Sequence, residues 1–313
     1  MKQHIKSSFI VLLMVILSAS NEFAAQAQVL VDVKKTFSGI ERIEVSGGSL
    51  EVEYIGSSAG SEILVNAFLE SNNPSQDIIF VTLGDVLKIS YQQTGNSRSM
   101  GNIRTKGHIK ISGPEAMVLN FQNGSGKIKV ENINSPQTNL TVGSGMIQAS
   151  KIRGDLQAKS GSGSIKLNSI TGDVKCTLGS GSADINEVKG DLHYSSGSGR
   201  ITAKNIEGLT AISLTSGSAS LVNIGELGEL KISSGSIRAE NAGLGSKTHL
   251  SGSSGSFRIQ TPSNLKDFNY SLKASSGSLR VGTIRTGRNL DINNQSKDFI
   301  KGTISSGSIS IDN

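Results

Sequence analysis

Three aspartates at a fixed spacing are the first residues in this chain that could do chemistry. Asp155, Asp173 and Asp191 each follow a glycine, and 18 residues separate each one from the next. If the repeat stacks, the carboxylates form a column, and Ca²⁺ accepts such oxygen ligands. The other interpretation is a repeated Gly-Asp turn, because aspartate accepts hydrogen bonds from nearby backbone. The calcium-binding nonapeptide pattern is absent, so we favour the turn and predict no metal and no cofactor.

Nucleophilic catalysis would need a reactive side chain with a base beside it. The one cysteine, Cys176, alternates with apolar residues, which predicts a buried thiol that packs as a small apolar side chain. His193 lies between the apolar residues Leu192 and Tyr194, so we expect its imidazole to face solvent. The Gly-Ser runs lack the Gly-Lys-Ser/Thr ending of a phosphate loop. We therefore predict no catalytic residues and no enzyme.

The elements that position these residues come from a Gly-Ser-Gly repeat. Five triplets follow one another at intervals of 19, 18, 18 and 18 residues, and the later copies read Ser-Gly-Ser. We predict that each triplet is a corner, because glycine accepts a positive φ without steric cost. The predicted corner residues are Gly124, Gly126, Gly143, Gly145, Gly161, Gly163, Gly179, Gly181, Gly197 and Gly199.

Apolar and polar residues alternate on both sides of each triplet, as in Val174-Lys175-Cys176 and Ala183-Asp184-Ile185. Each repeat therefore supplies two short strands with one apolar face, and so small a unit buries that face only by stacking. We predict an all-β, single-stranded parallel β-solenoid (β-helix) with about 18 residues per rung. The rule for parallel crossovers favours a right-handed coil, although the sequence itself leaves the handedness open. A β-sandwich would explain the alternation but not the period.

Stacking also predicts which side chains share a row. Ile165 should lie over Ala183, and Cys176 between Ala158 and Tyr194. The outward residues before the corner form our predicted contact face, which consists of Gln157, Lys159, Lys175, Thr177 and His193. We expect the last rung to be an open end of the solenoid. It is either a second contact surface or, as we favour, blunted by Asp312 and Asn313.

The chain divides into four parts. A basic start, an apolar run over residues 9–17 and Ala25-Gln26-Ala27 predict a signal peptide over residues 1–27, cleaved after Ala27. Residues 28–36 are a lead-in, and residues 37–117 are a divergent N-terminal β region, which is a cap or a set of irregular rungs. Residues 118–313 are the repeat solenoid. We expect inserts in it, such as 261–264 and 289–301, to form loops. No apolar run in the mature chain is long enough to cross a membrane.

The charge balance, 31 Lys and Arg against 25 Asp and Glu, is spread along the chain. Nucleic-acid binding is normally indicated by a clustered basic stripe, so we expect no nucleic-acid partner.

Several segments resemble a known group. Phe37-Ser38-Gly39-Ile40, the stretch from Ile109-Lys110-Ile111 to Pro114, and the iterated Gly-Ser-Gly/Ser-Ile rungs are similar to the bacterial "putative adhesin" family. That group is a domain-of-unknown-function family of Ser/Gly-rich β-solenoids, similar to the head GIN domains of auto-transporter-like adhesins. The resemblance covers residues 37–313 and implies a parallel β-solenoid at the cell envelope. It carries no catalytic residues.

The sequence therefore favours an exported, non-enzymatic, adhesin-like or structural module of the bacterial cell envelope, whose partner is a surface, a glycan or an envelope protein. It leaves open whether the protein is periplasmic, on the outer surface or secreted. One alternative is an envelope-stress or signalling accessory that binds a protein through its loops or its solenoid end. The least favoured alternative is a polysaccharide-active β-helix enzyme, since paired carboxylates in a cleft are not evident.

Overall fold

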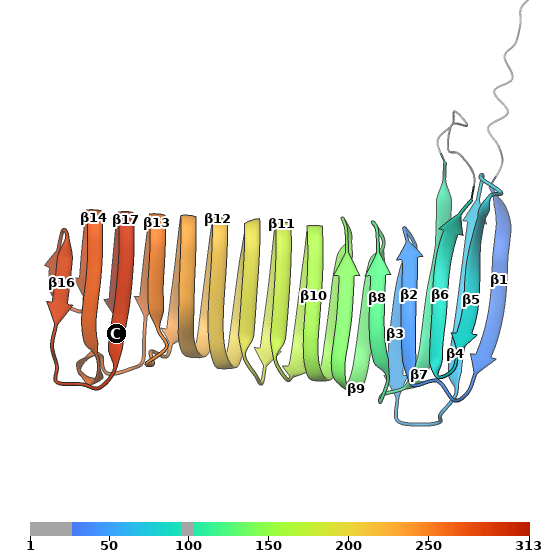
Figure 1. Ribbon diagram of the computed structural model, residues 1–313, viewed down its shortest axis with the longest axis horizontal. Helices are drawn as coiled ribbons and strands as arrows, with labels where there is room; N and C mark the ends of the chain where they lie inside the picture. Colours follow the sequence, from blue (N-terminus) through green and yellow to red (C-terminus); the bar gives the residue numbers. More distant parts are fainter. Residues whose placement is uncertain (1–26, 95–102) are drawn as a thin grey trace, which may run out of the picture.

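The computed structural model describes residues 27–94 and 103–313, which form an elongated stack of β-strands with turns along both edges (Figure 1). The expected signal peptide lies outside these residues except for Ala27. The only helix in the described part of the chain is one 3₁₀ turn, η1 (Leu265–Asp267), and no helix there could cross a membrane. The prediction of an all-β, repeating fold is confirmed.

Seventeen strands make up the described part of the chain. In chain order they are β1 (Gln28–Phe37), β2 (Arg42–Gly48), β3 (Glu51–Ser57), β4 (Ile63–Ser71), β5 (Gln76–Leu83), β6 (Val86–Gln93), β7 (Thr105–Pro114), β8 (Val118–Asn123), β9 (Lys127–Val142), β10 (Met146–Thr171), β11 (Val174–Val188), β12 (Leu192–Ala242), β13 (His249–Gln260), β14 (Asn269–Val281), β15 (Ile284–Thr286), β16 (Asn289–Ile292) and β17 (Phe299–Asp312).

The central strands β9 to β13 pair in parallel, and like positions of the repeat lie side by side. Lys175 pairs with Gln157 on one side and with His193 on the other. Ile165 pairs with Ala183, and Cys176 lies between Ala158 and Tyr194, as the row prediction required. The inward side chains of these rows are almost completely buried. Burial of an aliphatic side chain contributes roughly 1.5–3 kcal/mol, so the repeat is held by this narrow continuous core.

The N-terminal strands continue the same two layers. β2 lies between β8 and β6, and β3 lies between β9 and β7, with parallel pairing in every case. Beyond them β5, β4 and β1 add antiparallel pairs. Residues 28–36, expected only as a lead-in, form most of β1, which is outermost at this end (Figure 1).

The last strand in the sequence, β17, is not at the open end of the solenoid, so the expectation that the last rung forms this end is wrong. β17 lies between β13 and β14 and pairs in parallel with both (Figure 1). The outer neighbours of β14 are the short antiparallel strands β15 and β16. Part of the insert 289–301, expected as a loop, is therefore strand. Asp312 and Asn313 do not blunt the end, because short edge strands already do so.

The corner residues need glycine for a reason different from the one expected. Of the ten predicted corner glycines, only Gly181 has a positive φ, at 125°. Most of the others lie too close to the backbone of the neighbouring rung for a Cβ, whereas a Cβ on Gly199 would meet the Ser196 hydroxyl of its own rung. A Cβ built on Gly163, for example, would collide with the carbonyl oxygen of Gly145.

The left-handed residue of each rung lies elsewhere, six positions after the last glycine of the triplet. These residues have φ between 50° and 61° and are Asn132, Lys151, Ser169, Glu187, Asn205, Asn223 and Asn241. Four of the seven are asparagine, which adopts this region more readily than most residues. The sequence reading missed this column.

Replacing Gly163 by alanine should lower the free energy of unfolding by about 3 kcal/mol, because the added Cβ meets backbone that cannot move aside. The matched control is Gly287→Ala, where the nearest atom to the new Cβ would be 3.8 Å away. We expect that control to stay within about 0.5 kcal/mol of the wild type. Urea unfolding curves of the three proteins measure the difference, and equal midpoints would contradict the close-packed corner.

Candidate functional site

The carboxylates of the aspartate column are hydrogen-bonded to backbone N–H groups along one edge of the solenoid. One carboxylate oxygen of Asp155 accepts a hydrogen bond from the N–H of Asp173 at 3.0 Å, and Asp173 does the same for the N–H of Asp191 at 2.9 Å. Asp191 in turn accepts from the N–H of Leu209 at 2.8 Å. Each carboxylate therefore caps the next rung. The Gly-Asp turn interpretation expects hydrogen bonds inside one turn, whereas these bonds join neighbouring rungs.

Metal binding does not follow from this column. One oxygen of each carboxylate is already bonded to a backbone N–H. Within residues 27–94 and 103–313, no group of three or more His, Cys, Asp and Glu side chains is placed to hold a metal ion.

An open groove of about 390 Å³ runs beside the column, and we call it the aspartate groove. It brings together two features that the sequence presented separately, the aspartates and the predicted contact face. Its lining consists of Gln137, Asp155, Leu156, Gln157, Asp173, Val174, Lys175 and His193.

Three of the five predicted contact residues thus line one groove. Gln157, Lys175 and His193 form a single row across adjacent strands. Lys159 and Thr177 pair with each other in the next row towards the corner and do not line the groove. Lys159, Lys175 and His193 are exposed, whereas Gln157 and Thr177 are half-buried. The groove presents carboxylate, amide, ammonium and imidazole groups, a set that can bind a polar ligand by hydrogen bonds.

The Cys176 thiol offers no nucleophile. It is completely buried, and burial raises its pKa from 9.0 to about 12. Since the thiolate is the reactive form, the side chain acts as a packing residue. Its neighbour Tyr194 is also buried, and burial is the main cause that raises the tyrosine pKa from 10.0 to about 12.

A second groove, of about 300 Å³, lies beside the left-handed column and was not predicted. Its lining includes Ser169, Glu187, Lys189, Asn205 and Asn223. An asparagine ladder runs along it, in which each side-chain amide donates to the amide oxygen of the preceding rung. The ladder consists of Asn168, Asn186, Asn205, Asn223 and Asn241, with N···O distances from 2.8 to 3.0 Å. Asparagine at 205, 223 and 241, spaced by 18 residues, was the sequence signal.

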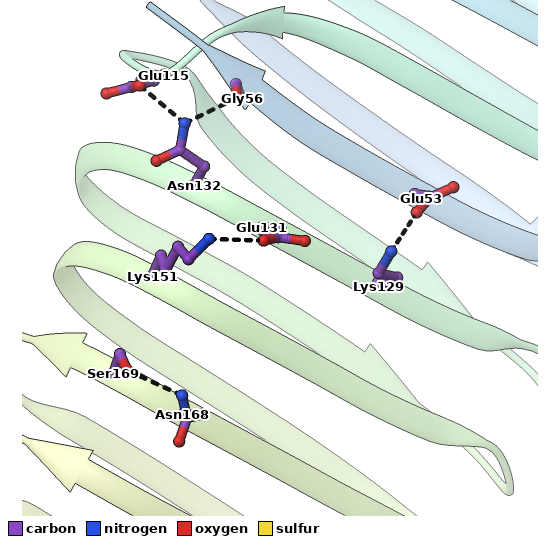
Figure 2. Close-up of polar contacts among 9 residues, drawn as sticks. All are labelled: Glu53, Gly56, Glu115, Lys129, Glu131, Asn132, Lys151, Asn168 and Ser169. Carbon is purple, nitrogen blue, oxygen red and sulfur yellow. Dashed lines mark hydrogen bonds and ion pairs between the residues drawn. The ribbon is translucent and has the colours of Figure 1, made fainter.

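Figure 2 shows how the same edge is held where the repeat meets the N-terminal strands. The side-chain amide of Asn132 donates to the Gly56 carbonyl at 2.9 Å and to Glu115 at 2.8 Å. Lys129 pairs with Glu53 at 2.6 Å. This pair is largely covered and joins β9 to β3, so it fixes the first repeat rung against the N-terminal strands.

The fold and its two edge grooves define a repeating β-solenoid that presents rows of polar side chains to solvent. The chain belongs to the Toastrack DUF4097 family. The sequence model of this family matches residues 40–221 and 206–312. The resemblance to a domain-of-unknown-function family of adhesin-like solenoids is thereby confirmed. The chain matches no curated protein.

Several solved structures align over most of the chain. A "putative lipid binding protein" from Parabacteroides distasonis is 15% identical, covers 90% of this chain and 96% of its own, and has a TM-score of 0.44. A "putative adhesin" from Parabacteroides merdae is 11% identical, with coverages of 91% and 96% and a TM-score of 0.39. One from Bacteroides fragilis is 10% identical, with coverages of 91% and 97% and a TM-score of 0.34. These likenesses carry no argument about function, because the TM-scores are below 0.5.

Asp173→Ala should lower the free energy of unfolding by about 1–2 kcal/mol, because the N–H of Asp191 loses its acceptor. The control is Asp184→Ala, an exposed aspartate of the same rung with no hydrogen bond or ion pair in the described part of the chain. That change should have an effect within about 0.5 kcal/mol. Thermal unfolding of both variants tests the prediction, and an equal loss in both would argue against the cap.

Alkaline pH should weaken the fold through Cys176. The pKa of the Cys176 thiol is 9.0 in the unfolded chain, so the thiol ionises there above this pH. In the folded protein the pKa is raised to about 12, so the thiol keeps its proton up to that pH. The unfolded state then binds fewer protons, so the free energy of unfolding falls by about 1.4 kcal/mol per pH unit for this group. Urea unfolding of wild type and Cys176→Ala between these pH values should show a shallower fall in the variant. Parallel curves would contradict the buried thiol.

Proposed function

We propose that this chain is an exported, non-enzymatic, adhesin-like or structural module of the bacterial cell envelope that contacts a glycan, a surface or an envelope protein through the aspartate groove. One observation carries the proposal: predicted contact residues from three adjacent strands line a single open groove together with Asp155 and Asp173. Its polar groups can bind polar ligands, and the grouping contains no buried nucleophile with a base.

The proposed mechanism is multivalent. Rows of polar side chains recur on adjacent strands about 4.8 Å apart, so a repeating ligand can make the same contact on several rungs. Each contact is weak, but linked contacts raise the overall affinity because later ones form at a high effective concentration. A stiff solenoid adds to this effect, since its rows are already aligned before binding.

The proposal includes the finer organisation inferred from the sequence. The signal peptide covers residues 1–27 and directs export, with cleavage after Ala27. Residues 37–117 act as an N-terminal cap or irregular rungs, and 118–313 as the repeat. The solenoid is a single right-handed coil with about 18 residues per rung, a spacing supported by the pairing of Val174 with Leu156 and Leu192.

A second candidate function, binding of a protein partner at a solenoid end, is favoured by one observation. Within residues 27–94 and 103–313, β5 pairs only with β6, so no described strand pairs with its other edge. Its outward side chains Ile79, Val81 and Leu83 are exposed and apolar. An extended segment of a partner could add to this edge as a further strand. Capture of one stoichiometric partner that is lost on Val81→Glu would favour this function over the first.

Lys175→Glu combined with His193→Glu should reduce attachment of the purified protein to cell-surface preparations and to a glycan array by at least about tenfold, because both side chains line the groove. The control pair, Lys204→Glu with Ser220→Glu, makes the same charge change at exposed positions outside the groove. Unchanged attachment of the groove variant, or an equal loss in the control, would count against the proposal.

A further inference from the structure

A row of arginines crosses the C-terminal strands on the face that follows the corner. Arg238 of β12 pairs in register with Arg258 of β13, and Arg258 pairs with Ser310 of β17. Ser310 pairs with Arg280 of β14, which pairs with Arg285 of β15. We call these four arginines the arginine row. It is continuous in space because β17 lies between β13 and β14.

The row carries more positive charge than its neighbours neutralise. Arg238 pairs with Glu240 and Arg280 pairs with Asp312, each at 2.6 Å. Arg258 and Arg285 have no carboxylate partner within the described residues. All four guanidinium side chains are exposed. Within the described residues, the guanidinium of Arg258 has no partner and that of Arg285 bonds only the Ser278 hydroxyl, so neither charge is neutralised. The other two guanidinium groups are held in place by exposed carboxylates.

A row of hydroxyl groups runs alongside. Ser236, Ser256, Ser308 and Ser278 pair in register on β12, β13, β17 and β14, two residues before Arg238, Arg258, Ser310 and Arg280. Arg285 donates from Nε to the Ser278 hydroxyl at 3.2 Å. Serine hydroxyls donate and accept hydrogen bonds, so the two rows together offer charged and neutral donors along a straight line.

We propose that the arginine row binds a linear anionic polysaccharide lying across the strands, through its carboxylate or sulfate groups. A guanidinium presents a planar pair of donors that matches such oxyanions. Adjacent strands are about 4.8 Å apart, so Arg238 and Arg258 are one strand spacing apart, and Arg258 and Arg280, on either side of Ser310, are two. The site shares no residue with the aspartate groove. It therefore goes beyond the proposed function and does not depend on it.

The test compares two triple variants of the C-terminal strands. Arg238→Gln/Arg258→Gln/Arg280→Gln removes three charges from the row. Lys231→Gln/Lys273→Gln/Lys301→Gln removes three exposed charges from β12, β14 and β17 at positions before the corner. The probes are a polygalacturonate oligosaccharide, dextran sulfate, neutral dextran and duplex DNA, measured by calorimetry at low and high salt. The unfolding midpoint of each variant checks that its fold is retained.

We expect wild type to bind one or both anionic polysaccharides, weaken with salt and ignore neutral dextran. The arginine variant should lose at least about tenfold in affinity, and the lysine variant less than about twofold. Preference between polygalacturonate and dextran sulfate identifies the anionic group. An Arg→Lys triple variant should also bind more weakly, since lysine lacks the planar fork.

Three results would overturn the inference: no binding of either anionic polysaccharide, equal loss in both triple variants, or tighter binding of duplex DNA than of the polysaccharides. Equal loss would mean that overall charge and not the row attracts the ligand. The Lys175→Glu/His193→Glu variant separates this site from the aspartate groove, because it should keep its affinity for the anionic probes.

Discussion

The whole molecule depends on the parallel stacking of one rung on the next. Backbone hydrogen bonds between rungs bring like residues to about 4.8 Å from each other, so any feature of one rung is imposed on its neighbours. At the corners the backbones are closer still, and the Cβ that Gly163 lacks would meet the carbonyl of Gly145. A single side chain out of place would therefore disturb three rungs and not one.

Stacking also decides where polar groups are satisfied. The interior is filled mainly by apolar side chains, with Cys176 and Tyr194 buried among them, and the edges carry repeated polar contacts between rungs. There the aspartate column caps the backbone N–H groups of successive rungs, and the asparagine ladder pairs amide with amide. In both cases one hydrogen bond is repeated from rung to rung, because each rung presents the same polar group to its neighbour and that group needs a partner.

The outward faces are free of these constraints, so their side chains are available for contacts with a partner. Every side chain that points to solvent from a stacked strand is part of a row, so a row by itself does not indicate a binding site. Two sets differ from a plain solvated surface. The aspartate groove combines a hollow with convergent polar groups, and the arginine row combines excess charge with in-register donors. Fold alone assigns neither of them a ligand.

Most of the repeat could be predicted from the sequence, because its signals are local. Alternation of apolar and polar residues, the 18-residue period and the glycine positions together specify the strands and the rows, including Ala158, Cys176 and Tyr194. The physical reason for glycine and the left-handed column were not predicted. Both depend on how closely two rungs approach, and that distance is absent from a single rung.

Only the tertiary structure decided what lies at the ends and which rows meet. The order of strands in space departs from their order in the chain where β17 enters between β13 and β14, and no local pattern marks that exchange. Ser276-Gly277-Ser278 and Ser306-Gly307-Ser308 carry the same repeat signal, so either could stack on β13. The choice rests on non-local packing, with Arg280 pairing with Asp312 and β15 and β16 covering the outer edge of β14. The sequence by itself therefore determined the repeating unit, and the tertiary structure determined the order in which the last units stack.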